Sequence, residues 1–147
     1  MHCEIRTLLF VCTGNTCRSP MAAALARKQL DKRGRGDIMV ESAGLAADGS
    51  PVSANAVAVL REIGVDIAGR ASRPVTAEMC RQADIIAVMS PQHAAALTLR
   101  FGVPTEKVRV LGSGIPDPFG SGKDIYRLTR DRLDEAVAAL LSSLEAV

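Results

Sequence analysis

Short apolar runs alternate with helical patterns along this chain, and this alternation constrains the fold more than any other feature. From the apolar runs, we expect buried strands at residues 5–11, 38–42, 84–89 and 107–111. We expect helices at residues 19–34, 51–63, 76–83 and 91–101, and a longest helix that starts at Ser121. Strands and helices in this order form a parallel sheet with helices on both faces. The sequence therefore predicts an α/β fold with four parallel strands.

Length and composition suit one small enzyme domain. A chain of 147 residues with 48% hydrophobic residues can bury a full core within the usual size of one domain. No repeat, linker or low-complexity tract divides it, so we expect a single domain over residues 1–147. Apolar residues recur at helical spacing in the last helix, which indicates core packing: Leu133, Val137, Leu140 and Leu144.

Charge and composition argue against two classes of partner. The formal net charge is +2, the basic residues are scattered, and stacking platforms are missing because there is no Trp, one Tyr and three Phe. We therefore expect no nucleic-acid partner. The first residues run directly into a strand without the apolar core of a signal peptide, and no apolar stretch is long enough to span a bilayer. We expect a cytoplasmic protein with no membrane partner.

The cysteines do not indicate a disulfide scaffold or a metal site. Their density is lower than in secreted scaffolds, and a cytoplasmic setting favours free or catalytic thiols. They also lack zinc-site spacing, so we expect no metal at any of them: Cys3, Cys12, Cys17 and Cys80.

The segment FVCTGNTCRSP, residues 10–20, ends the first apolar run and opens the first expected helix. It places Cys12 six residues before Arg18. Residues that curl around one point aim several backbone N–H groups inward, and the planar fork of Arg18 suits phosphate oxygens. Gly14 allows close backbone approach or a positive φ, and Asn15 also tolerates the left-handed region. The segment predicts a phosphate-binding loop after the first strand, at the edge where open α/β sheets bind ligands.

Cys12 has the expected surroundings of a nucleophile. A cysteine attacks phosphorus only as a thiolate, which helix N-termini and nearby cations favour. The helix after the loop and Arg18 supply both aids. Ser19 is a suitable N-cap, with Pro20 at the first helical position, and its hydroxyl is able to donate to the sulfur or to a departing oxyanion. A cysteine and an arginine six apart also arise by chance, but the position after a buried strand favours a site.

A phosphoryl-transfer site also needs an acid for the leaving group, and Asp117 is the candidate. It lies in a Gly- and Pro-rich loop, residues 112–122, after the fourth expected strand and therefore near the sheet edge that carries Cys12. Pro118 holds Asp117 in an extended conformation. An aspartate before proline is by itself more often a turn residue. The presence of the Cys12 segment favours the catalytic interpretation.

Together these motifs resemble the low-molecular-weight protein tyrosine phosphatases. The resemblance rests on residues 11–21, 42–44, 83–89 and 117–120 and covers nearly the whole chain. It implies that Cys12 is the nucleophile, that Arg18 binds the phosphoryl group and that Asp117 is general acid and then base. It also implies phosphate binding by the rest of the loop: Thr13, Gly14, Asn15, Thr16, Cys17 and Ser19. The hydrogen-bond network that fixes the loop is expected at Asn15, Ser19 and Ser42.

Two positions resemble one branch of that family. Typical tyrosine phosphatases carry a bulky aliphatic residue where this chain has Thr16, and Tyr or Trp where it has Phe119 and Gly120. The bacterial protein arginine phosphatases instead carry a loop threonine and the Asp-Pro-Phe-Gly segment found here at residues 117–120. A cationic guanidinium needs polar partners, which a hydroxyl and a carboxylate supply. We therefore expect Thr16 and Phe119 to set specificity.

The resemblance implies hydrolysis of phosphoarginine in phosphorylated protein substrates through a phosphocysteine intermediate, with no metal or organic cofactor. A tyrosine phosphatase of the same family is the alternative. An arsenate reductase is less favoured because Cys80 is the only downstream thiol and falls in the helix expected at residues 76–83. A non-catalytic phosphoprotein-binding module is also less favoured because the chain retains Cys12 and Asp117.

Two further residues lie close to these motifs. Cys17 is either the partner of Cys12 in a reversible disulfide or a buried small hydrophobe, and the sequence favours neither. His93 follows Ser90-Pro91 at a helix start, where we expect capping or surface exposure. Nothing in the sequence indicates the oligomeric state.

Overall fold

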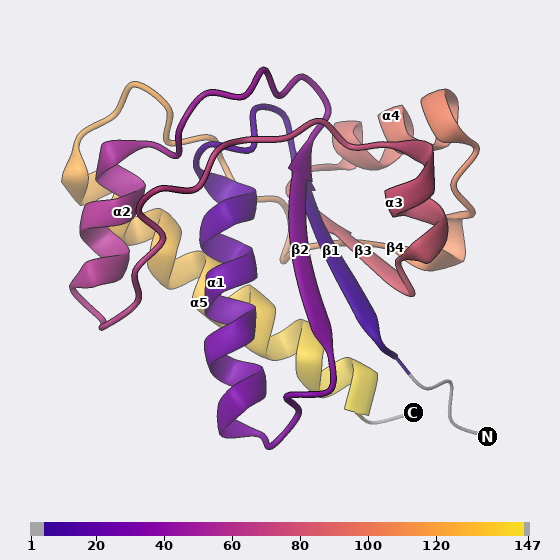
Figure 1. The fold of residues 1–147 in the computed structure, drawn as a ribbon, viewed down its shortest axis with the longest axis horizontal. Helices are drawn as coiled ribbons and strands as arrows, with labels where there is room; N and C mark the ends of the chain where they lie inside the picture. Colours follow the sequence, from indigo (N-terminus) through magenta and orange to yellow (C-terminus); the bar gives the residue numbers. More distant parts are fainter. Residues whose placement is uncertain (1–4, 146–147) are drawn as a thin grey trace.

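The computed structural model describes residues 5–145 and contains a four-stranded sheet between two layers of helices (Figure 1). Every neighbouring pair of strands is parallel, and the order is β2-β1-β3-β4. The strands are β1 (Thr7–Cys12), β2 (Met39–Gly44), β3 (Ile85–Val88) and β4 (Val108–Val110). The predicted α/β fold with four parallel strands is therefore confirmed. Cys3 lies outside the described residues.

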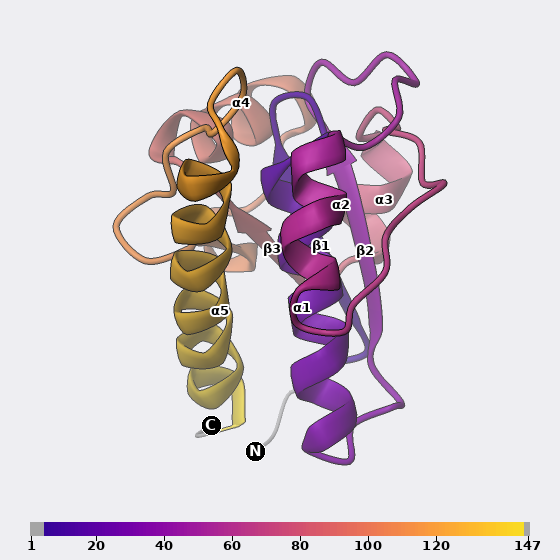
Figure 2. The same cartoon turned by 90° about the vertical axis from the view of Figure 1, so that its left-hand side faces the viewer.

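Helices cover both faces of this sheet (Figures 1 and 2). On one face lie α1 (Arg18–Lys32) and α5 (Lys123–Glu145), and α2 (Ala54–Arg61) packs against α5 on the same side. The other face packs against α3 (Ala77–Gln82) and α4 (Pro91–Phe101), and a short 3-10 turn, Thr105–Lys107, precedes β4. Within residues 5–145, no helix is both long and apolar enough to cross a bilayer.

The central position of β1 in the sheet explains why its sequence is a continuous apolar run. Leu8 and Phe10 face the core under α1 and α5, whereas Leu9 and Val11 face the core under α3 and α4. Successive side chains of a strand point to opposite faces, so a strand buried on both faces is apolar throughout. This arrangement brings the end of β1, and with it Cys12, to the centre of the carboxyl edge of the sheet.

Most helix starts follow local capping. Ser90 caps α4 by accepting a hydrogen bond from the backbone N–H of His93, and Gly102 ends that helix in the left-handed region with φ 64°. The expectation that a helix begins at residue 51 is wrong. Ser53 caps α2 by accepting from Ala56 N–H, so the helix begins three residues later.

The start of α1 also differs from the prediction. Cys17 occupies the N-cap position without a side-chain capping bond, and Ser19 is already the second residue of the helix. The Ser19 hydroxyl lies 3.0 Å from Cys12 Sγ instead. Ser19, which the sequence pattern assigned to capping, therefore has its hydroxyl beside the sulfur of Cys12 and not at the helix start.

Candidate active site

The loop of residues 13–17 joins β1 to α1 at the carboxyl edge of the sheet. Two of its carbonyl oxygens, those of Thr13 and Thr16, accept hydrogen bonds from N–H groups of the chain that follows β2, and so does the carbonyl oxygen of Cys12 at the end of β1. These backbone hydrogen bonds run from Leu45 to Cys12 at 2.9 Å, from Ala46 to Thr13 at 2.8 Å and from Ser53 to Thr16 at 2.8 Å. Carbonyls held outward leave loop N–H groups free to face an anion at the centre of the loop.

Gly44, at the end of β2, lies against the back of the loop. A Cβ atom at this position would stand 2.6 Å from the Thr13 carbonyl oxygen and 2.9 Å from both Cβ and N of Asn15. The φ angle of Gly44 is not positive, so the close approach of two backbone segments, rather than a left-handed conformation, requires glycine here. The sequence motif at residues 42–44 contains this glycine, but its steric role appears only in three dimensions.

Asn15 holds the loop in shape. Its φ is 57°, and it is the only non-glycine residue in the left-handed region among residues 5–145, a conformation that asparagine tolerates. Its side-chain amide donates to Ser19 Oγ at 2.7 Å and to Ser42 Oγ at 3.1 Å. Oδ1 of the same side chain accepts from the backbone N–H of Arg73 at 3.0 Å. The structure thus brings Asn15, Ser19 and Ser42 together, and it adds Arg73, which the sequence did not indicate.

The positive φ that the sequence allows at Gly14 is not found in the structure. A Cβ atom there would meet only Thr16 Oγ1, at an ordinary 3.5 Å. The left-handed turn of the loop is formed by the next residue. Close approach of an anion to the Gly14 backbone remains a prediction.

Cys12 lies at the bottom of the loop with donors around its sulfur. Its side chain is 2% exposed. Ser19 Oγ lies 3.0 Å from Sγ, and the backbone N–H of Asn15 donates to Sγ at 3.2 Å. The sulfur therefore lies beside a hydroxyl and a backbone N–H group at the N-terminal end of α1.

Arg18 closes the loop and connects it to the chain after β4. Its guanidinium donates to the carbonyl oxygen of Ile115 at 2.9 Å and forms an ion pair with Asp117 at 3.6 Å between Nη2 and Oδ2. The guanidinium is buried, whereas the Asp117 carboxylate is half exposed. The predicted proximity of residues 12, 18 and 117 is therefore found in the structure.

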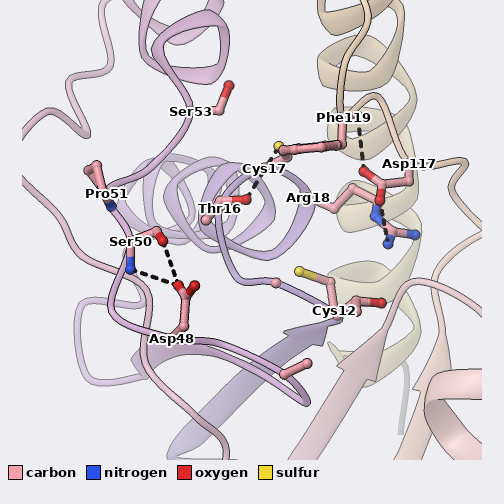
Figure 3. A pocket seen from close by; sticks show the side chains of 13 residues that line it. Cys12, Thr16, Cys17, Arg18, Asp48, Ser50, Pro51, Ser53, Asp117 and Phe119 are labelled. Carbon is pink, nitrogen blue, oxygen red and sulfur yellow. Dashed lines mark hydrogen bonds and ion pairs between the residues drawn. The ribbon is translucent and has the colours of Figure 1, made fainter.

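A pocket of about 530 Å³ opens above Cys12 (Figure 3). Asp117 and Phe119 form one side of it, and the backbone N–H of Phe119 donates to Asp117 Oδ1 at 3.1 Å. The Phe119 ring is 76% exposed and stands at the rim. Thr16 lines the pocket as well, so the two residues expected to set specificity share the cavity with the thiol.

Cys17 is buried and contacts α5. Its Sγ lies 3.1 Å from the hydroxyl of Tyr126, which also accepts a hydrogen bond from Ser53 Oγ at 3.0 Å. Burial, followed by the contact with Cys17, raises the pKa of Tyr126 to about 12. Cys12 and Cys17 are both free thiols here, and a disulfide between them stays a prediction.

His93 takes part in the cap of α4 through its backbone N–H, but its side chain contradicts the expectation of surface exposure. Its side chain is 6% exposed, and Nε2 lies 2.9 Å from Thr13 Oγ1. Nδ1 is buried without a hydrogen-bond partner. Burial, and then the charge of Arg18, lower the pKa of His93. The predicted topology could have indicated this position. The carboxyl ends of the neighbouring strands β1 and β3 lie at the same sheet edge, so the start of α4 lies close to the loop after β1.

Cys80 lies far from this chemistry in the fold. It is buried in α3 within the core on the face of the sheet that α4 covers. Burial raises its pKa, so its thiol is a poor nucleophile. The interpretation of Cys80 as a packed helix residue agrees with this position.

Comparisons with known proteins match this geometry to one family. The model of the low molecular weight phosphotyrosine protein phosphatases matches residues 7–147. A protein-arginine-phosphatase of Bacillus subtilis (strain 168) is 38% identical over 146 residues, which cover 94% of this chain and 96% of that protein. The low molecular weight protein-tyrosine-phosphatase Etp of Escherichia coli (strain K12) is 34% identical and covers 90% of both chains.

A solved structure agrees with these matches. A cysteine-to-serine mutant of the YwlE arginine phosphatase, whose active-site serine is phosphorylated, superposes with a TM-score of 0.89. It is 35% identical, and the match covers 95% of both chains.

Proposed function

The chain belongs to the low molecular weight phosphotyrosine protein phosphatase family, and on that premise we propose that it hydrolyses phosphoarginine in proteins through a phosphocysteine intermediate. As a member it is a cysteine-dependent protein phosphatase. The observation that carries the choice of substrate is the hydroxyl of Thr16, which lines the pocket above Cys12 together with the Asp117 carboxylate. A hydroxyl and a carboxylate suit a cationic guanidinium better than an apolar ring. The similarity to the arginine phosphatase of B. subtilis supports the same substrate class.

In the first step the Cys12 thiolate attacks phosphorus in line with the departing guanidino nitrogen. The S–P bond forms as the P–N bond breaks, and protonated Asp117 donates its proton to the leaving nitrogen. Arg18 and the inward N–H groups of the loop bind the equatorial oxygens, where charge gathers in the transition state. Ser19, 3.0 Å from the sulfur, stabilises the thiolate before attack.

In the second step water hydrolyses the phosphocysteine. The Asp117 carboxylate takes a proton from the water as the new O–P bond forms, and the S–P bond breaks to return the Cys12 thiolate and inorganic phosphate. Serine in the active site of the YwlE mutant carries a phosphoryl group, which supports a covalent intermediate on the residue it replaces. Asp117 thus changes from acid to base between the steps.

The test is turnover of two peptides that differ only in the phosphorylated residue, phosphoarginine or phosphotyrosine. We expect a higher kcat/KM for the phosphoarginine peptide and no turnover by Cys12→Ala. Preference of the native protein for phosphotyrosine would keep the mechanism and refute the substrate. Detectable turnover by clean Cys12→Ala would refute the mechanism itself.

The role of Thr16 is tested by an aliphatic replacement. Thr16→Ile removes the hydroxyl and adds an apolar surface to the pocket, so it should lower activity on phosphoarginine and spare or raise activity on phosphotyrosine. Equal losses on both substrates would show that Thr16 supports the loop without choosing the substrate.

Two other functions have weaker support. Reduction of arsenate through a relay of thiols needs a second reactive cysteine, and Cys80 is buried in the opposite layer of the fold. Capture of phosphoproteins without turnover needs no acid, yet Asp117 stands beside Arg18 at the pocket. Both features favour hydrolysis.

A further inference from the structure

The mouth of the active-site pocket carries a second carboxylate. Asp48, in the loop that follows β2, lines the pocket on the side opposite Asp117 and Phe119 (Figure 3). Its side chain points toward the opening above Cys12 in that view. The mechanism above uses Asp117 and leaves Asp48 without a role. The wall around Asp48 contains no aromatic residue, because its other members are Ala46, Ser50, Pro51 and Ser53.

The loop holds this carboxylate in place as an anion. The backbone N–H of Ser50 donates to Asp48 Oδ1 at 3.0 Å, and the Ser50 hydroxyl donates to the same oxygen. These hydrogen bonds lower the pKa of Asp48. Asp48 is therefore an exposed, oriented carboxylate that forms no ion pair with a lysine or arginine among residues 5–145.

The charge of Asp48 bears on which phosphorylated side chain fits the pocket. A phosphoryl group bound in the loop contacts Arg18. The substrate side chain that carries this group then passes Asp117 and extends toward the mouth of the pocket. A guanidinium has three nitrogens, of which one bears phosphorus and faces Asp117. The remaining N–H groups are directed outward, where a second carboxylate is a suitable acceptor. The neutral aromatic ring of a phosphotyrosine would have no hydrogen bond to offer Asp48 and no aromatic residue to stack on at the wall around it.

We propose that Asp48 is a specificity-determining residue that accepts hydrogen bonds from the outer guanidinium nitrogens of a phosphoarginine substrate. The inference rests on the proposed function and extends it, because it divides two tasks between two carboxylates. Asp117 serves the reacting nitrogen, and Asp48 binds the charge that stays on the rest of the guanidinium. The same charge disfavours phosphotyrosine peptides, since they offer Asp48 nothing to bind.

The chain offers a matched control for the test. Asp66 is exposed like Asp48, and it accepts a hydrogen bond from the backbone N–H two residues on, Ala68, at 2.9 Å. It lies outside the pocket. Asp48→Asn and Asp66→Asn therefore remove the same charge from the same kind of turn. They differ in position and in the exposed ion pair that Asp66 forms with Arg61, at 3.5 Å.

The experiment compares kcat/KM for the native protein and both variants on phosphoarginine and phosphotyrosine peptides with identical uncharged flanking residues. We expect Asp48→Asn to lower kcat/KM for phosphoarginine about fivefold, mainly through KM, because exposed pairs contribute modestly. The loss should shrink at about 0.5 M salt, where screening is strong. Asp66→Asn should match the native protein on both substrates.

The outcomes separate this inference from the proposed function. If the native protein hydrolyses phosphoarginine and Asp48→Asn leaves the ratio of the two activities unchanged, the role of Asp48 is refuted and the proposed function stands. Equal changes with Asp66→Asn would likewise refute it, since net charge alone would then explain the effect. If the native protein fails on phosphoarginine, both are refuted.

Discussion

Replacing Gly44 by alanine tests whether the back of the loop sets the geometry of catalysis. The added Cβ would stand 2.6 Å from the Thr13 carbonyl oxygen, and it must move about 0.8 Å away to reach the 3.4 Å of ordinary contact. The atoms it meets belong to backbone or to the first side-chain carbon of Asn15, so none can rotate out of the way. The loop and β2 must therefore separate.

The expected cost is larger for activity than for stability. Forcing an extra methyl group into a packed site lowers the free energy of unfolding by about 1–3 kcal/mol. A displacement of about 1 Å in a group that positions the reacting atoms can cost about 100-fold in rate. Gly44→Ala should therefore remain folded at room temperature, with kcat reduced by about two orders of magnitude.

The assay pairs urea unfolding with kcat on a small aryl phosphate, which is independent of protein substrate choice. Gly36→Ala is the control, because no heavy atom lies within 4 Å of its added Cβ and its φ is not positive. We expect native activity and native or slightly higher stability for it. Native kcat in Gly44→Ala would refute the steric argument, and so would an equal loss in Gly36→Ala.

Other predictions concern the residues around the loop. Because His93 has a lowered pKa, from an ordinary 6.5, the free energy of unfolding should decline as pH falls below about 6.5; urea titrations down to about pH 5 should show a shallower decline for His93→Gln. Tyr126→Phe should lower stability by about 1 kcal/mol in thermal unfolding, because the buried groups of Cys17 and Ser53 lose a partner. Peroxide should produce a Cys12 to Cys17 disulfide in mass spectrometry, and sulfinic acid at Cys12 without it would contradict that expectation.

Much of the fold follows from local signals in the sequence. Ser90, Pro91 and Gly102 mark both ends of α4 because capping depends on a few neighbouring residues. The apolar run of β1 indicates a strand buried on both faces, and the alternation of elements then leads to parallel pairing. The positive φ of Asn15 was also predictable, since few other residues tolerate it.

The parts that the sequence did not reveal depend on contacts between distant segments. Ser19 has the pattern of an N-cap, but in the fold its hydroxyl lies beside Cys12 and Asn15, so tertiary contacts prevail over the local preference. His93 has the pattern of a helix-start residue, and only the neighbouring strands place it against Thr13. Gly44 is constrained by backbone atoms that are about thirty residues away in the chain.

The outward bonding of the loop carbonyls has a consequence for the thermodynamics of binding. Fixing one residue costs about 1–2 kcal/mol of conformational entropy. In this fold the chain after β2 fixes the loop, so that cost is incurred when the protein folds and not when a phosphoryl group arrives. We expect the same bonds to slow the exchange of the amide hydrogens of Leu45, Ala46 and Ser53 with solvent. The chain after β2 thus fixes the loop during folding, and a phosphoryl group that binds has little left to order.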